Sequence, residues 1–308
     1  MRNRLTTLVL SLSKDELPGL AMTIPFVRMH GAGNDFVLID DRAGRLHRQR
    51  SALAKAVCRR RTGLGGDGLI LIGRAPDGSA ADFAMTYVNA DGNDGEMCGN
   101  GARCAARRAA ELGLVRDRGA FATPAGLIRA SISGSHVTLG MTDPVDERPA
   151  ITLEVDGRAF ELWYIDTGVP HVVAFVDDLD DLDVETVGRR LRHHPAFAPR
   201  GVNANFAEPA GPSRLRARTY ERGVEAETLA CGTGAVAIAL VAFRRGLAAS
   251  PVTIVPPGGE LVIGFRTDVD ARFRDVTLSG PTERIAIGEI DDGWLAAHGL
   301  ESLTAAAA

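Results

Sequence analysis

Short apolar runs, many of them interleaved with polar residues and bounded by glycine-containing turns, recur along the whole chain. Such runs predict β-strands. In the first half, the predicted strands cover residues 25–30, 36–40, 69–73, 81–89, 119–123, 127–132 and 136–141. In the second half, they cover residues 150–155, 159–166, 171–176, 204–208, 215–221, 252–255, 260–266 and 275–279.

Four other stretches are predicted to be helices, two in each half: 51–60, 101–112, 184–192 and 233–245. The second helix of each half follows the same element, Cys-Gly-x-Gly-Ala, with Cys98 in EMCGNGARCAAR and Cys231 in LACGTGAVAIAL. This duplication predicts two similar lobes, residues 22–143 and 144–280. The helical segment GAVAIALVAF is apolar on nearly every side, so we expect its own sheet to bury it.

Composition and charge are typical of a soluble globular protein. The 308 residues are 45% hydrophobic and 24% charged, with a net charge of −4. We expect no nucleic-acid partner, because no basic block is present. We expect no membrane partner either, because no apolar run reaches the roughly 18 residues of a spanning helix.

Four cysteines, Cys58, Cys98, Cys104 and Cys231, are too few for a disulfide framework and lack the C-x-x-C spacing of zinc sites. They predict a protein of the reducing cytoplasm without a metal.

The first 21 residues are basic and then briefly apolar, and the apolar run is broken by Lys14, Asp15 and Glu16. That is a poor signal peptide. We interpret residues 1–21 as a disordered tail or a start-site artefact and expect the ordered protein to begin near Met22.

A cysteine at a helix start can have unusual reactivity. The free N–H groups and the helix dipole favour negative charge there, so we expect each thiol to ionise below its reference pKa of about 8.5. The neighbouring glycines would let an anion approach the N–H groups. Cys58 and Cys104, on predicted helix bodies, are interpreted instead as inert core residues.

Two such elements facing each other would suit the inversion of a carbon centre. One thiolate removes a proton from one face, and the other thiol delivers a proton to the opposite face. Racemisation of an amino acid is the simplest example, with the helix-start N–H groups stabilising the charge that develops on its carboxylate. The two thiols would titrate as a coupled pair.

Six motifs give the chain a family resemblance: MHGAGNDF, GLGGDGLI, YVNADGNDGEMCGNGARC, DTGVPHVV, YERGVEAETLACGTGA and PPGGEL. Together they resemble the diaminopimelate epimerase family, from about residue 22 to about residue 290. The resemblance implies interconversion of LL- and meso-2,6-diaminopimelate for lysine and peptidoglycan precursors, without pyridoxal phosphate, another cofactor or a metal. It implies an α+β fold of two similar lobes, each a β-barrel-like sheet wrapped around a central helix, with the active site in the cleft between them. A final strand, at about 281–295, would return to the first lobe.

The resemblance also implies roles for individual residues. Cys98 and Cys231 match the catalytic acid/base pair, and His171 matches a histidine that assists one cysteine, as a neutral base or as an imidazolium. The matched substrate-binding residues are Asn34, Asn89, Gly99, Asn100, Asn203, Glu221, Arg222, Gly232 and Thr233. Among these, Glu221 and Arg222 match an acid–base couple for the ammonium and carboxylate groups.

Simpler roles compete with some of these assignments. Asn34 suits a turn, Glu221 and Arg222 suit an exposed ion pair, and His171 suits the start of a strand. Asp67 suits a turn or a cap and is assigned no chemistry.

Two positions depart from the pattern of some family members, which carry glutamine at Gly68 and asparagine at Val169. A small apolar residue at Val169 cannot bind the far carboxylate, so the remaining polar residues or water would have to do so.

Other function classes remain open. A racemase for proline or hydroxyproline would share the cysteine elements, but it would have no use for so many polar residues at a far end. A non-catalytic binder or a thiol redox protein is the alternative from another class, although redox cysteines are expected close together. The resemblance leaves a homodimer open.

Overall fold

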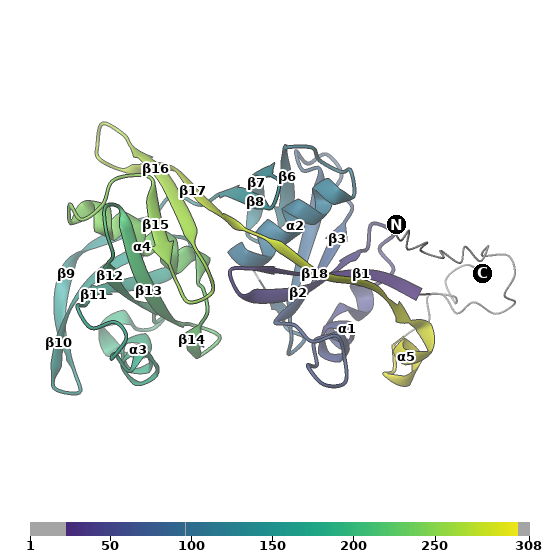
Figure 1. The fold of residues 1–308 in the computed structure, drawn as a ribbon, viewed down its shortest axis with the longest axis horizontal. Coiled ribbons are helices and arrows are strands. Elements are labelled where there is room, and N and C mark those ends of the chain that lie inside the picture. The colour runs from purple at the N-terminus through teal and green to yellow at the C-terminus, as the bar shows by residue number, and fades with distance from the viewer. Residues whose placement is uncertain (1–22, 96, 301–308) are drawn as a thin grey trace, which may run out of the picture.

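The computed structural model of the protein describes residues 23–95 and 97–300. The chain forms two lobes that lie side by side along the long axis of the molecule (Figure 1). The predicted N-terminal tail, residues 1–21, lies outside the described residues. In the described part of the chain, no helix has both the length and the apolar character needed to cross a bilayer.

The first lobe has two α-helices, a short 3-10 helix and eight strands. They are β1 (Thr23–Gly31), β2 (Asn34–Asp40), η2 (His47–Gln49), α1 (Arg50–Val57), β3 (Gly68–Gly73), β4 (Phe83–Asn89), β5 (Asp94–Gly95), α2 (Gly99–Glu111), β6 (Arg118–Thr123), β7 (Gly126–Ser133) and β8 (His136–Gly140).

Within the described residues, the second lobe also has two α-helices and a short 3-10 helix, with nine strands instead of eight, and it is followed by one strand and one short helix. It comprises β9 (Asp146–Val155), β10 (Arg158–Asp166), β11 (Pro170–Phe175), α3 (Val184–Arg192), η3 (Pro195–Phe197), β12 (Asn203–Pro209), β13 (Arg214–Glu221), β14 (Ala226–Thr228), α4 (Gly232–Arg244), β15 (Val252–Val255), β16 (Leu261–Thr267) and β17 (Phe273–Pro281). The last elements of the described residues are β18 (Glu283–Asp291) and α5 (Asp292–Ala297).

Both lobes use the same strand connections. β2 and β3 pair in parallel, as do β4 and β6; in the second lobe, β11–β12 and β13–β15 are the parallel pairs. A parallel pair requires a crossover, and a helix supplies it each time: α1 and α2 in the first lobe, α3 and α4 in the second. The repeated cysteine element is thus one part of a duplication of the whole lobe.

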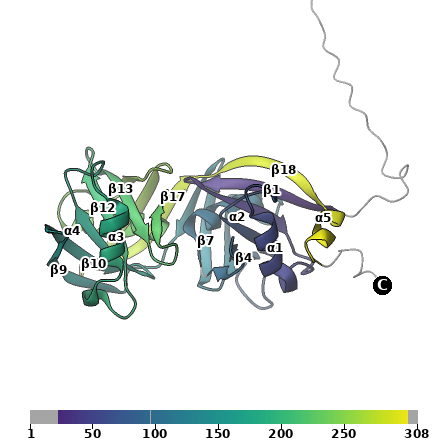
Figure 2. The same ribbon diagram turned by 90° about the horizontal axis from the view of Figure 1, so that it is seen from below.

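Two strands connect the lobes. β17 of the second lobe pairs with β8 of the first, with Leu278 opposite Leu139. The chain then continues into β18, which pairs with β1 of the first lobe (Figures 1 and 2). A continuous run of hydrogen-bonded strands therefore joins the two lobes.

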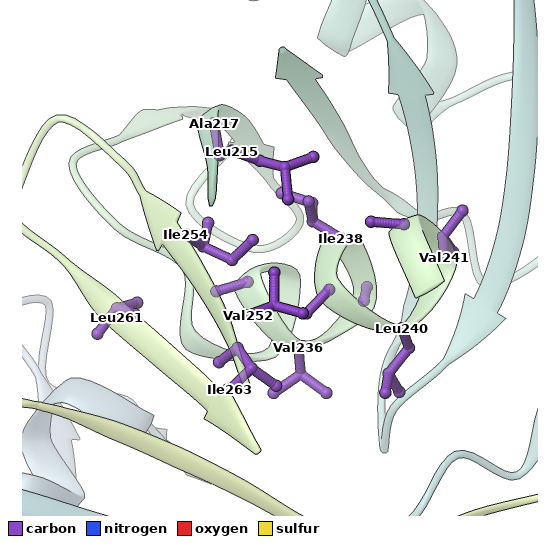
Figure 3. Packing of buried hydrophobic residues seen from close by; sticks show 14 of the residues in the cluster. Leu215, Ala217, Val236, Ile238, Leu240, Val241, Val252, Ile254, Leu261 and Ile263 are labelled. Carbon is purple, nitrogen blue, oxygen red and sulfur yellow. The ribbon is translucent and has the colours of Figure 1, made fainter. Parts of the chain in front are cut away.

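Each lobe is packed around its cysteine-bearing helix. The apolar α4 is surrounded by the strands of its own lobe, and Val236, Ile238 and Leu240 are 0% exposed, as predicted (Figure 3). α2 fills the corresponding place in the first lobe and contacts β1, β2, β3, β4, β7 and β8. Burial of each such aliphatic side chain contributes about 1.5–3 kcal/mol. Both helix starts are consequently held by a rigid core.

Most predicted elements are present, and the exceptions have physical reasons. The prediction missed the first four residues of β9, which begins at Asp146 rather than 150, because DERP is polar and contains a proline. Among the described strands, β9 pairs only with β10. β5 and β14 are too short to leave a periodic signal. Cys58 lies at the C-cap of α1 rather than on the helix body, although it is buried as expected.

Candidate active site

The first turns of α2 and α4 meet at the junction of the lobes. A Cβ atom built on Gly99 would lie 3.8 Å from the Cα of Gly232, and one on Gly232 would lie 3.7 Å from the Cα of Gly99. Cys98 and Cys231 are the N-cap residues directly before these glycines. Two cysteine elements that are far apart in sequence are therefore brought together at one place.

The two helix starts also lack the usual side-chain cap. The side chain of Asp183 caps α3 by accepting a hydrogen bond from the N–H of Thr186 at 3.0 Å. Neither Cys98 nor Cys231 makes such a cap hydrogen bond as a thiol, although the N–H groups of Asn100, Gly101 and Gly234 lie close enough to stabilise a thiolate. An anion could take that role at α2 and α4, because a helix start binds negative charge through its unpaired N–H groups.

The predicted lowering of the thiol pKa was wrong. Burial raises the pKa of Cys98 to about 11, and burial also raises the pKa of Cys231. The helix-start N–H groups of Gly101 and Asn100 at Cys98, and of Gly234 at Cys231, act in the opposite direction. Removing the sulfur atoms from water outweighs these N–H groups. Both cysteines are therefore thiols at neutral pH before a ligand binds.

Glu221, at the end of β13, interacts with both thiols. Its negative charge contributes to the raised pKa of Cys98 and of Cys231. Burial raises the pKa of the Glu221 carboxyl itself, and hydrogen bonds from Thr228 and from the Cys231 thiol oppose that rise. The Thr228 hydroxyl donates to Oε2 at 3.0 Å. One partly buried carboxyl thus lies within electrostatic reach of both sulfur atoms.

A cavity of about 230 Å³ lies beside these groups and has walls from both lobes. The sequence predicted four of its lining residues: Asn203, Glu221, Arg222 and Thr233. The others are Met97, Ala125, Ile128, Met141, Thr142, Thr167, Gly168 and Val169. The two cysteines are not among the lining residues, but Met97 directly precedes Cys98 in the chain and Thr233 lies two residues after Cys231.

Sequence reasoning missed most of the first-lobe wall. Ala125, Ile128 and Met141 resemble any residue of a strand or turn, so no motif marks them. Thr167 and Gly168 carried a signal, because both fall within the DTGVPHVV motif. The hydroxyl of Thr167 donates to the carbonyl of Thr233 at 3.3 Å, which ties this motif to the start of α4.

Arg222 is not paired with Glu221. In the described residues, the Arg222 guanidinium has no carboxylate partner, and its Nη1 donates only to the carbonyl of Arg200 at 3.5 Å. Its backbone N–H donates to Oδ1 of Asn203 at 2.8 Å. The exposed ion pair considered from the sequence is therefore wrong, and the Arg222 charge in the cavity wall is available to an anionic ligand.

The predicted asparagines differ in their surroundings. Asn203 is 3% exposed, and its Nδ2 donates to the carbonyl of Pro170 at 3.1 Å. The amide of Asn100 donates to Asn34 in its own lobe and to the carbonyl of Ala230 in the other lobe, the latter at 3.0 Å. Asn89 closes a turn at the end of β4 through its main chain and does not line the cavity.

His171 is fully buried in β11 and electrically neutral. Nδ2 of Asn205 lies 3.2 Å from Nδ1 of His171, and Oδ1 of Asn205 accepts from Thr219. Nδ1 therefore acts as the acceptor, and the ring proton is on Nε2, which has no hydrogen-bond partner among the described residues. Burial lowers the pKa of His171 to about 3, and the charge of Arg222 acts in the same direction. The alternative of an imidazolium is wrong; a neutral ring remains.

The structure shows the surroundings of Gly68 and Val169, the two positions that depart from the family pattern. A Cβ atom on Gly68 would lie 2.5 Å from the ring of Tyr87 and 2.8 Å from the carbonyl of Val88, so no larger residue fits there. Val169 lines the cavity and adds an apolar surface to it. In the described residues, no three His, Cys, Asp or Glu side chains cluster as a metal site would require.

Comparisons with known proteins agree with this geometry. The family model for diaminopimelate epimerase matches residues 26–146 and 163–279. The diaminopimelate epimerase of Aquifex aeolicus is 41% identical over 278 residues, which cover 87% of this chain and 98% of that protein. The diaminopimelate epimerase of Chlorobaculum tepidum is 43% identical over 267 residues, which cover 85% of this chain and 99% of that protein.

Solved structures share the fold at much lower identity. A PhzF-family phenazine biosynthesis protein of Bacillus anthracis has a TM-score of 0.68 and 16% identity, covering 87% of this chain and 99% of that one. A hydroxyproline epimerase from Agrobacterium vitis has a TM-score of 0.59 and 19% identity, covering 87% of this chain and 92% of that one. These likenesses support the predicted α+β fold of two lobes. With the family model matching most of its length, the chain belongs to the diaminopimelate epimerase family.

Proposed function

We propose that this protein interconverts LL- and meso-2,6-diaminopimelate, with Cys98 and Cys231 as the two acid/base groups. The observation that carries the proposal is the meeting of two uncapped, cysteine-bearing helix starts beside one cavity. One helix start would make a single anion site. Two of them offer one carboxylate a set of donors with a thiol from each lobe.

The substrate carboxylate at the reacting carbon would take the place of the missing caps. Backbone N–H groups at Gly99, Asn100, Gly232 and Thr233 would bind it and stabilise the charge that develops as the α-proton leaves. One cysteine, as thiolate, removes that proton from one face, and the other, as thiol, delivers its own proton to the opposite face. The number of protons is conserved, and the two sulfurs exchange protonation states in each turnover.

Because both thiol pKa values are raised, the thiolate must be generated inside the site. Glu221 suits this task at Cys231, because the thiol already donates to its carboxylate and burial has raised its pKa toward that of the thiol. Arrival of the substrate ammonium group near Glu221 would further favour the charged pair. The neutral ring of His171 carries its proton on Nε2, its unpartnered atom, so at that atom it can only donate.

The far end of the substrate would bind in the cavity. Arg222, which has no carboxylate partner among the described residues, is suited to form a bidentate hydrogen bond with the second carboxylate. Asn203 would contribute its amide, and Asn34 and Asn89 are proposed as further polar contacts. Val169 adds no hydrogen bond, so recognition of the far carboxylate is expected to depend on Arg222.

A proton-exchange assay in deuterated water tests the proposal. We expect purified protein to epimerise LL-diaminopimelate and to place deuterium at one carbon only, with no turnover of proline or hydroxyproline. Cys98→Ala and Cys231→Ala should each abolish epimerisation, whereas Cys104→Ala, nearly two turns further along α2, should retain it. Full activity of either of the first two variants would remove the two-base mechanism, and turnover of proline instead would change the substrate class. A homodimer remains a prediction that light scattering can check.

A further inference from the structure

A directed row of hydrogen bonds runs through the first lobe to the start of α2. Nη2 of Arg103 donates to Oδ1 of Asn100 at 2.9 Å, and Nδ2 of Asn100 donates to Oδ1 of Asn34. Nδ2 of Asn34 then donates to Oδ2 of Asp67 at 3.2 Å. We call these four side chains the amide relay. Every donor in the amide relay points from the guanidinium toward the carboxylate.

The charged ends fix the orientation of the amides between them. A carboxamide can turn over and exchange its oxygen and nitrogen, but a guanidinium only donates and a carboxylate only accepts. Asn100 must therefore present its oxygen to Arg103, and Asn34 must present its nitrogen to Asp67. Opposite charges at the two ends also polarise the bonds between them in one direction.

Arg103 is an unusual residue to find in this place. Its side chain is 0% exposed, it has no ion-pair partner among the described residues, and its Nε is without a hydrogen-bond partner. Gly280 leaves room for it, because a Cβ atom there would lie 3.2 Å from Nε. A buried charge without a counter-ion is costly unless something compensates it. The negative charges that Arg103 would sense are the thiolates of Cys98 and Cys104.

The same amide connects the lobes. The second N–H of Asn100 donates to the carbonyl of Ala230, the residue directly before Cys231. An Asn100 side chain turned the other way would present its oxygen to that carbonyl, and the contact would become repulsive. The orientation imposed by Arg103 thus helps to hold the segment that ends in Cys231 against the start of α2.

We propose that Arg103 and Asp67 are positioning residues that act through Asn100 and Asn34 to fix the two cysteine elements relative to each other. Arg103 also compensates the negative charge that arises at the start of α2 when Cys98 ionises. The inference rests on the proposed function for its effect on turnover, but not for its effect on the Cys98 thiol.

Kinetics of matched variants test the amide relay. Arg103→Met and Asp67→Leu remove the two ends, and Arg103→Lys and Asp67→Asn retain a donor or an acceptor. Each removal should lower kcat about a hundredfold, the loss expected from a misplacement of roughly 1 Å, with a smaller change in KM. The conservative variants should retain more activity. Arg108→Met, a partly exposed position of the same helix whose side chain pairs with Glu111, is the control and should match the wild type.

The double variant decides whether the two ends act together. If both act through the same two amides, Arg103→Met combined with Asp67→Leu should be no slower than the slower single variant. Losses that multiply, or conservative variants as slow as the removals, would overturn the proposal. Asp67 is partly exposed, so its variants provide this test even if Arg103→Met fails to fold.

Alkylation of Cys98 provides a measurement without turnover. In Arg103→Met, the midpoint of iodoacetamide alkylation, mapped by peptide mass, should rise by about one pH unit, which slows the reaction about tenfold at a given pH. If the wild type does not turn over diaminopimelate but this shift occurs, the proposed function fails and the role of Arg103 stands. An unshifted midpoint in folded Arg103→Met overturns that role.

Discussion

Glu221→Gln is the substitution that most sharply separates ionisation of the thiols from turnover. The carboxylate raises the pKa of both Cys98 and Cys231, and it is also the group proposed to accept the proton of Cys231. Glutamine has the same shape and can still accept the hydrogen bond from Thr228. The substitution therefore removes the charge and the base while leaving the packing in place.

The two consequences have opposite signs. Removing a nearby negative charge should lower the thiol pKa values by about one unit, so that alkylation at a given pH becomes about tenfold faster. Loss of a positioned general base should slow epimerisation by about a hundredfold to ten-thousandfold. Thiols that react faster with iodoacetamide in an enzyme that turns over more slowly are thus the expected result.

Both measurements can be made on one preparation, with alkylation followed by peptide mass and epimerisation followed by proton exchange in deuterated water. Glu227→Gln, whose carboxylate pairs with Arg218 at 2.7 Å, is the matched control and should change neither rate substantially. Slower alkylation in Glu221→Gln, or unchanged epimerisation, would refute the assignment of Glu221 to the proton of Cys231.

Three further predictions concern His171, Arg222 and Gly232. The folded state holds His171 neutral down to a pH of about 3, whereas the unfolded ring binds a proton below 6.5, so stability should be lost by about 1.4 kcal/mol per pH unit as pH falls between these values. Urea unfolding at several pH values should show a shallower loss for His171→Gln, and an unchanged slope would contradict the buried neutral ring. Arg222→Met should raise KM for diaminopimelate about tenfold to a hundredfold, the worth of a charge-assisted hydrogen bond, and an unchanged KM would argue for another far-end contact. Gly232→Ala should lower stability by about 1–3 kcal/mol and reduce kcat, because the new Cβ would lie 3.0 Å from Leu278; restoration by Leu278→Val in both unfolding and turnover assays would confirm the cause.

The sequence alone determined the repeated parts of the molecule. The strand-rich pattern and the four main helices followed from local periodicity, and α3 has the predicted bounds. The repetition of Cys-Gly-x-Gly-Ala identified two equivalent helix starts, which the structure confirms as the first turns of α2 and α4. These features depend on residues close to one another in the chain, so the local sequence is enough to predict them.

Tertiary structure decided the electrostatics and the partners of the site. The thiol pKa values are raised rather than lowered because whole lobes exclude water from the sulfur atoms, an effect that no helix start reveals by itself. The sequence assigned no chemistry to Asp67 and no role to Arg103. The hydrogen bonds that link them pass through Asn34 and Asn100, and two of these bonds join residues that are far apart in the chain. Burial and long-range hydrogen bonds are properties of the packed molecule. The sequence could therefore supply the two thiols and their helix starts, but only the packing of one lobe against the other set their separation and their charge.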